Sequence, residues 1–254
     1  MEKKKPPYLP SELVIQILVR LPVKSLIRFK CVSKSWLTLI SDPNFANSHF
    51  QLTAPHTRRI LAISSLSHEI QSIDFESSVN HEYTSLTLNL NSPPPFSFPL
   101  EIEGSCRGFL FLRHYSKFYL WNPSTGFHRQ IPESPFHSKF DVRTGCFPCV
   151  YGFGYDQSRD DYLLVLLSSK TKHDLWSYLE FFSLRDNTWK EIKGTHFPYN
   201  NANYDPGPGT LFNGAIHWLG NVIVVFDLME RKLSGMNLPD DLEHAPGYLE
   251  NFLV

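Results

Sequence analysis

"LPVKSLIRFKCVSKSWLTLI" (residues 21–40) places lysine and arginine among many large apolar side chains. Across residues 9–40, 18 of 32 side chains are apolar. One helical face, with the spacing i, i+4, i+7 and i+8, is formed by Val32, Trp36, Leu39 and Ile40. A unit of about forty residues rarely supplies enough core to bury such a surface. The surplus therefore packs either on the rest of the chain or on a partner.

Three short helices are expected in the first fifty residues. The first covers residues 13–21, and its apolar face comprises Leu13, Val14, Ile17, Leu18 and Leu21. Ile15 and Val19 fall outside that face. Pro22 ends the helix, because the residue before a proline is pushed out of the α region. A second helical stretch begins near Lys24, and "SDPNF" opens a third, with Asp42 as its N-cap.

Basic charge is concentrated at the start of the chain. Residues 1–34 hold eight Lys/Arg and two Glu, although the whole chain has a net charge of only −1. These cations alternate with core-type residues instead of forming an open cluster. We therefore expect an acidic protein partner and no nucleic acid.

The N-terminal sequence and the cysteine content indicate the cellular compartment. The basic start "MEKKKPPYLP" has no apolar segment directly behind it that could serve as a signal peptide, and "LVIQILVRLP" is too short to cross a bilayer. Four cysteines without an N-x-[ST] acceptor fit a reducing compartment. We expect a cytoplasmic and/or nuclear protein that does not bind membranes.

The rest of the chain has the pattern of short strands joined by turns. After "NSPPPFSFP", which is predicted to be a loop, residues 106–132 can be laid on residues 212–239. This alignment pairs Gly108 with Gly214, Trp121 with Phe226, Asn122 with Asp227 and Pro132 with Pro239. A third unit of the same shape lies between them, with its turn at Arg185 to Thr188. Turns near 122, 185 and 227 have the spacing of propeller blades, so three blades are predicted.

Both halves resemble known families. "LPSELVIQILVRLPVKSLIRFKCVSKSW" followed by "DPNFANSHF" resembles the F-box, the helical module that docks F-box proteins onto a Skp-type adaptor in cullin-based ubiquitin ligases. "GSCRGFLFL", "LWNPSTGFHRQIP", "YGFGYD" and "NGAIHWLG" resemble the F-box-associated domain of a large plant family. No Gly-Gly pair is present, so kelch repeats proper match less well.

These resemblances imply α and β structure in segregated domains, a three-helix F-box followed by an all-β, propeller-like domain. We expect the F-box at residues 1–50, a linker or a degenerate first blade at 51–103, and the F-box-associated domain at 104–254. Members of this family are usually longer than this chain, so we expect its β domain to be incomplete.

The resemblance also implies which residues bind the adaptor and cullin. They are Leu9, Pro10, Leu13, Ile17, Leu18, Leu21, Pro22, Leu26, Phe29, Val32, Trp36 and Ile40. Some of these must form the internal core of the unit instead. Trp36 is the best single anchor, because large amphipathic rings often carry much of an interface's energy. A basic ring around the apolar patch would be formed by Arg20, Lys24, Arg28, Lys30 and Lys34.

The sequence contains no pattern typical of an enzyme. "CFPC" (Cys146 to Cys149) has no second ligand pair at metal spacing, so a loop role is expected. Asp160 and Asp161 are adjacent and are interpreted as a solvated turn. Aromatic residues at repeat positions, namely Trp121, Trp189 and Trp218, are interpreted as blade core. We expect no cofactor, no metal and no catalysis.

The function that these resemblances imply is that of a substrate-receptor subunit of a Skp-cullin-F-box ubiquitin ligase. Such a subunit binds a Skp-type adaptor, through it a cullin, and a target whose identity the sequence does not give. Residues 170–177 and 198–209 are the best candidate target loops, because they are long and polar. One alternative is a non-degradative or adaptor-sequestering protein, and a weaker one is a propeller-type lectin or hydrolase with an unrelated helical start.

Overall fold

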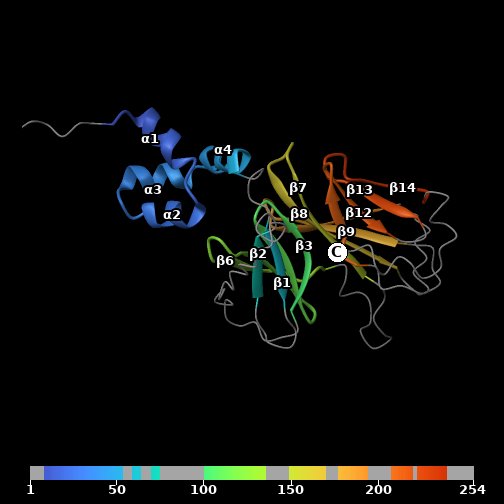
Figure 1. Ribbon diagram of the computed structural model, residues 1–254. Coiled ribbons are helices and arrows are strands. Elements are labelled where there is room, and N and C mark those ends of the chain that lie inside the picture. Colours follow the sequence, from blue (N-terminus) through green and yellow to red (C-terminus); the bar gives the residue numbers. More distant parts are fainter. Residues whose placement is uncertain are drawn as a thin grey trace, which may run out of the picture. The chain divides into compact units, whose positions relative to one another are not determined.

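The computed structural model describes residues 9–53, 59–63, 70–74, 100–135, 149–169, 177–193, 207–219 and 222–238. Two compact units make up the chain. One holds residues 1–98 with the turn 122–127, and the other holds the remaining residues. The helices belong to the first unit, and nearly all of the described β structure belongs to the second (Figure 1). The term helical unit is used below for residues 9–53, and the term β unit for the described residues from 100 onward.

Four helices form the start of the chain, one more than the sequence predicts. They are α1 (Ser11–Leu18), α2 (Val23–Phe29), α3 (Lys34–Ser41) and α4 (Pro43–Thr53). The predicted second helix is divided into α2 and α3, because Ser33 is extended and its Oγ accepts a hydrogen bond from the amide of Trp36, 3.2 Å away. The count of three helices is therefore wrong, although the helical character of this region is confirmed.

Each helix begins at a residue that the sequence makes easy to recognise. Pro10 and Pro22 are extended, and each carbonyl accepts hydrogen bonds from the first turn of the helix that follows. Asp42 caps α4 as predicted, since its Oδ1 accepts from the amides of Asn44 at 2.7 Å and Phe45 at 3.4 Å. The prolines of the two Leu-Pro pairs are thus the residues that directly precede α1 and α2.

The strands among the described residues form one two-stranded and three four-stranded antiparallel sheets. The small sheet pairs β1 (Arg59–Ile63) with β2 (Ile70–Asp74). The first large sheet has β3 (Glu101–Cys106), β4 (Phe109–His114), β5 (Lys117–Asn122) and β6 (Phe127–Ile131). The second has β7 (Cys149–Asp156), β8 (Asp161–Ser169), β9 (Ser177–Ser183) and β10 (Thr188–Ile192). The third has β11 (Thr210–Phe212), β12 (Ala215–Leu219), β13 (Ile223–Asp227) and β14 (Lys232–Met236). The prediction of three blades is confirmed.

The turns explain the internal repeat. Arg107 and Gly108 both have positive φ in the two-residue β3–β4 loop, and so do Asn213 and Gly214 in the β11–β12 loop. Positive φ at both central residues is the requirement of a type I′ hairpin turn. The predicted equivalence of the two glycines is therefore confirmed, whereas Pro239 lies outside the described residues.

The second sheet lies between the other two large sheets, and its side chains alternate between them. On β8, Leu163 and Val165 belong to the core shared with the third sheet, whereas Leu164 and Leu166 belong to the core shared with the first. This strict alternation is the period of a strand buried on both faces. It makes the second sheet the structural centre of the β unit.

Candidate adaptor-binding surface

The helical unit has a small core of its own. Its buried residues are Leu18, Val19, Leu26, Ile40 and Phe45, with Val14, Leu21, Phe29, Trp36 and Leu39 packed against them. Val19, which the helical wheel placed outside the apolar face, is buried directly after the last residue of α1. His49 on α4 is also buried, and its Nε2 donates to the carbonyl of Leu21 at 2.8 Å. This bond ties α4 to the turn that follows α1.

Large apolar side chains nevertheless remain on the surface of this unit. Those exposed are Leu9, Leu13, Ile15, Ile17, Ile27, Val32, Leu37 and Leu52. Ile17 is 52% exposed and Val32 is 60% exposed. Monomeric domains rarely leave so many apolar side chains in water, and clusters of them mark interaction sites. The surplus apolar surface expected from the sequence is thus present.

The twelve predicted interface residues divide into three groups. Those exposed are Leu9, Pro10, Leu13, Ile17, Pro22 and Val32. Those partly buried are Leu21, Phe29 and Trp36. Those buried in the core are Leu18, Leu26 and Ile40. Only the first two groups offer side-chain surface to a partner in this conformation, whereas the third group holds the helices together.

Trp36, the predicted anchor, belongs partly to the core. Its ring packs edge-to-face on Phe29, with ring centroids 5.6 Å apart and an interplanar angle of 69°. Such a pair contributes about 0.5–1.5 kcal/mol beyond the buried area. Removing Trp36 would therefore weaken the helical unit as well as any interface that its exposed edge forms.

Four exposed apolar residues of this unit were not among the predicted interface residues. Ile15, Ile27, Leu37 and Leu52 lie on α1, α2, α3 and α4, respectively. The sequence signal for Ile15 was its position outside the apolar face of α1. The other three carry no pattern that separates them from core residues.

The surface of the helices is basic. Arg20, Lys24, Arg28 and Lys34 are exposed and Lys30 is partly buried. Within the described residues, none of the five lies within ion-pair distance of a carboxylate. Residues 13–41 contain no Asp or Glu at all. The unit therefore presents uncompensated positive charge beside its exposed apolar side chains.

The remaining sequence-predicted features lie in the β unit or outside the described residues. The interpretation as blade core is confirmed for Trp218, which is buried in the core shared by the second and third sheets. Trp189 is partly buried against the core shared by the first and second sheets and donates from Nε1 to the carbonyl of Pro132 at 2.7 Å. Trp121 is buried but belongs to neither of these two cores. Cys146 and most of the two candidate target loops lie outside the described residues.

The interpretation of Asp160 and Asp161 as a solvated turn is wrong for one of the two. Asp161 is buried, and its carboxylate accepts from Ser183 Oγ at 2.5 Å and from the amide of Arg185 at 2.9 Å. Asp160 is exposed and accepts a hydrogen bond from the Tyr155 hydroxyl. Asp161 is buried because the β9–β10 turn supplies the donors that its carboxylate needs.

The described residues include neither a metal-binding cluster nor a membrane-spanning helix. No group of three or more His, Cys, Asp or Glu side chains lies in an arrangement that could hold a metal ion. No described helix is long and apolar enough to cross a membrane.

Comparison with known proteins identifies both halves of the chain. A family model for the F-box domain matches residues 7–48, and one for the F-box associated beta propeller domain matches residues 61–244. The chain therefore belongs to the family of F-box proteins that carry an F-box associated beta propeller domain.

Its relatives include three F-box proteins of Arabidopsis thaliana. F-box/kelch-repeat protein At3g23880 is 32% identical over 84% of this chain, and F-box protein At1g30790 is 28% identical over 95% of it. F-box protein CPR1 is 29% identical over 91% of the chain. The matches span 59%, 65% and 60% of these relatives, so the chain covers about three fifths of their length.

Proposed function

We propose that this protein is a substrate-receptor subunit of a Skp-cullin-F-box ubiquitin ligase. The helical unit binds a Skp-type adaptor and through it a cullin, and the β unit binds the target. The protein performs no chemistry itself, and its contribution is to hold the target close to a ubiquitin-loaded enzyme.

The single observation that carries this proposal is the exposed apolar surface of a helical unit that has its own core. Leu13 and Ile17 lie one helical turn apart on α1 and are both exposed, although Val14 and Leu18 on the same helix pack into the core. An isolated helical unit gains nothing from this second apolar face. A partner that covers the face gains about 25 cal/mol for each Å² of apolar surface removed from water.

The basic side chains beside this surface indicate the chemistry of the partner. An adaptor with acidic groups around an apolar docking face would be attracted to Lys24, Arg28 and Lys34 before contact. Screening by salt should then slow association while leaving dissociation nearly unchanged, since steering acts on the rate of encounter. An association rate constant that does not vary between 50 mM and 500 mM salt would contradict the role given to these cations.

Binding of the full chain to a purified Skp-type adaptor tests the proposal directly. We expect a stoichiometric complex that also recruits a cullin in a pull-down. Absence of binding by a chain whose helices are shown by circular dichroism to be folded would overturn the proposal.

The alternative is a non-degradative or adaptor-sequestering F-box protein, in which the adaptor is bound but no target is ubiquitinated. The two are distinguished by adding the chain to cells and measuring total ubiquitination by the adaptor's other receptors. A fall in this ubiquitination, with no protein degraded faster than before, would favour sequestration. We place either activity in the cytoplasm and/or nucleus, where adaptor, cullin and reduced cysteines occur together.

A further inference from the structure

Two buried carboxylates face each other where β7 and β8 meet at their turn. Asp156 and Asp161 are direct cross-strand partners, and they are only 1% and 3% exposed. Like charges directly opposite each other on a sheet are destabilising, and a buried charge requires a compensating partner. The surrounding residues must therefore supply positive charge.

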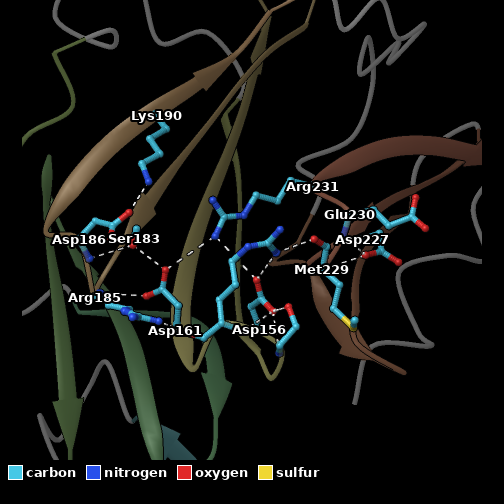
Figure 2. Close-up of polar contacts among 12 residues, drawn as sticks. Asp156, Asp161, Ser183, Arg185, Asp186, Lys190, Asp227, Met229, Glu230 and Arg231 are labelled. Carbon is cyan, nitrogen blue, oxygen red and sulfur yellow. Dashed lines mark hydrogen bonds and ion pairs between the residues drawn. The ribbon is translucent and has the colours of Figure 1, made fainter.

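That charge comes partly from another sheet. Arg231 lies in the β13–β14 turn, and its Nη2 is 3.7 Å from Asp156 Oδ2 and 3.9 Å from Asp161 Oδ2. Its guanidinium also lies over the ring of Phe181 on β9, 4.7 Å from the centroid. Figure 2 shows Asp156 and Asp161 directed toward Arg231 from the second sheet.

A second arginine, on the second sheet, reaches across to the β13–β14 turn of the third sheet. Arg159, in the β7–β8 turn, donates from Nη1 to Asp156 Oδ2 at 2.8 Å and to the carbonyl of Met229 at 2.7 Å. Met229 belongs to the β13–β14 turn, so Arg159 connects the second sheet to the third. Both arginines therefore converge on the Asp156 carboxylate.

The backbone of Arg231 gives independent support. Four turns of the chain are equivalent, and the residue with positive φ in them is Gly126 in the first sheet, Asp160 and Asn187 in the second and Arg231 in the third, with φ of 74°, 50°, 55° and 56°. Gly126 and Arg231 also make the same amide-to-carbonyl bond, to Asn122 and Asp227, respectively. Glycine and asparagine adopt this conformation readily, whereas a long side chain is strained in it. A residue kept in a strained conformation indicates that its side chain has a role.

We propose that Arg231, Arg159, Asp156 and Asp161 form an electrostatic latch that fixes the third sheet to the second. The side chain of Arg231 is retained at a strained backbone position because it neutralises the two buried carboxylates. The latch also fixes the relative positions of the connections that leave these sheets. It does not depend on whether the helical unit binds an adaptor.

Arg231→Gly gives opposite results according to whether the latch exists. Glycine relieves the backbone strain, so the substitution stabilises the third sheet if the arginine side chain contributes nothing. If the latch holds, the loss of charge beside two buried carboxylates outweighs this relief. We expect amide hydrogen exchange of β12 and β13, measured by mass spectrometry on the full chain, to accelerate at least about tenfold. Exchange in α1 to α4 should not change.

Asp156→Asn tests the other side of the latch while leaving the turn intact. Asn122 caps an equivalent kind of turn through Oδ1, so an asparagine at 156 can still accept from the amides of Ser158 and Arg159. We expect faster exchange of β12 and β13 in this variant, and a smaller effect of Arg231→Gly in its background.

Asp227→Asn is the matched control, because Asp227 caps the β13–β14 turn through the amides of Met229 and Glu230 and makes no ion pair within the described residues. This variant should exchange like the unmodified chain. Unchanged or slower exchange in Arg231→Gly would overturn the proposal, as would full additivity of Arg231→Gly with Asp156→Asn. If Asp156→Asn fails to fold, the Arg231→Gly result alone decides.

Discussion

At the scale of single residues, the helical unit places buried and exposed apolar side chains next to each other. Leu18 is 1% exposed and Ile17, its neighbour in sequence, is 52% exposed. A charge at position 18 is buried in the core, whereas a charge at position 17 enters water. The two positions therefore distinguish loss of the fold from loss of an interface.

Ile17→Asp should abolish adaptor binding without unfolding the helices, because the exposed side chain contributes to the proposed docking surface alone. We expect the affinity to fall by about thirtyfold or more, the effect of losing a central interface residue. Isothermal titration with the adaptor and circular dichroism of the same sample measure the two properties. Met236→Asp is the matched control, since Met236 is 55% exposed but lies on β14, outside the helical unit. Equal loss of affinity in both variants would contradict this location of the interface.

Trp36→Ala should lower both the stability of the helical unit and its affinity for the adaptor. The ring packs on Phe29 and is also partly exposed, so its removal costs core contacts as well as interface contacts. We expect the melting temperature of the helical unit to fall together with adaptor affinity. Trp189→Ala, in the β unit, should leave adaptor affinity unchanged, and a fall there would indicate that the β unit takes part in adaptor binding.

Acid should open the latch through Asp156. Burial alone raises the pKa of this carboxyl, but the hydrogen bonds from Ser158 and Arg159 outweigh burial and hold the pKa below its ordinary value of 3.8. Arg231 and Asp161 are the other charged groups that face it.

A carboxyl whose pKa is lowered on folding contributes stability that is present above its unfolded pKa and is lost as the pH falls through the folded pKa. The difference in stability between the unmodified chain and Asp156→Asn should therefore be full at pH 7 and shrink below about pH 4, as followed by hydrogen exchange or urea unfolding. A constant difference across this range would exclude the mechanism.

At the scale of the elements, the glycines of β7 allow strands of two sheets to meet. Gly152 forms a parallel bridge with Gly209, whose amide donates to the carbonyl of Tyr151 at 2.7 Å. A Cβ at Gly152 would lie 2.5 Å from Ile216 Cγ2 and 2.9 Å from Trp218 Cζ2. Ile216 and Trp218 are both buried, so neither can move aside easily.

Gly152→Ala should accordingly destabilise the second and third sheets by about 1–3 kcal/mol through overpacking. Chemical denaturation followed by tryptophan fluorescence, with α-helix unfolding followed separately by circular dichroism, measures the effect. If overlap with Ile216 is the cause, the double variant Gly152→Ala with Ile216→Ala should lose less stability than the sum of the two single variants. Strict additivity would assign the effect to another cause.

The sequence predicts elements well where the deciding interaction is local. Gly108, Gly214, Asn122 and Asp227 mark turns through their own conformational preferences and side-chain oxygens, and the turns occur where they were predicted. Pro22 and Asp42 likewise locate the starts of α2 and α4, although α1 already ends at Leu18 instead of continuing to Leu21 as predicted.

The sequence fails where the deciding partner is distant. The helical wheel groups Leu13 with Val14, but only packing by other helices decides which of the two is buried. The burial of Asp161 depends on donors from the β9–β10 turn and on Arg231, which no local pattern connects to it. Ser33 divides a helical face that continues on both sides of it, so the fourth helix could not be read from apolar spacing.

At the scale of the whole molecule, three clusters of buried residues in the described part of the chain each lie within the helices or within the large sheets. The core around Leu18 and Phe45 contains helical residues only, and the two cores around Val165 and Leu166 contain residues of the large sheets only. Such units usually fold and function independently. Adaptor binding and target binding should then be separable.

Removing residues 1–53 should therefore abolish adaptor binding and retain target binding. We expect affinity purification of the tagged full chain to recover adaptor, cullin and target, and purification of the shortened chain to recover the target alone. A target held by a receptor without an adaptor escapes ubiquitination, so expression of the shortened chain should lengthen the half-life of the target. Full-length Ile17→Asp is the matched control, because it should give the same set of partners with the β unit in its original context. If the shortened chain loses every partner while full-length Ile17→Asp keeps the target, the β unit requires the helices for its fold, and the two activities are not independent.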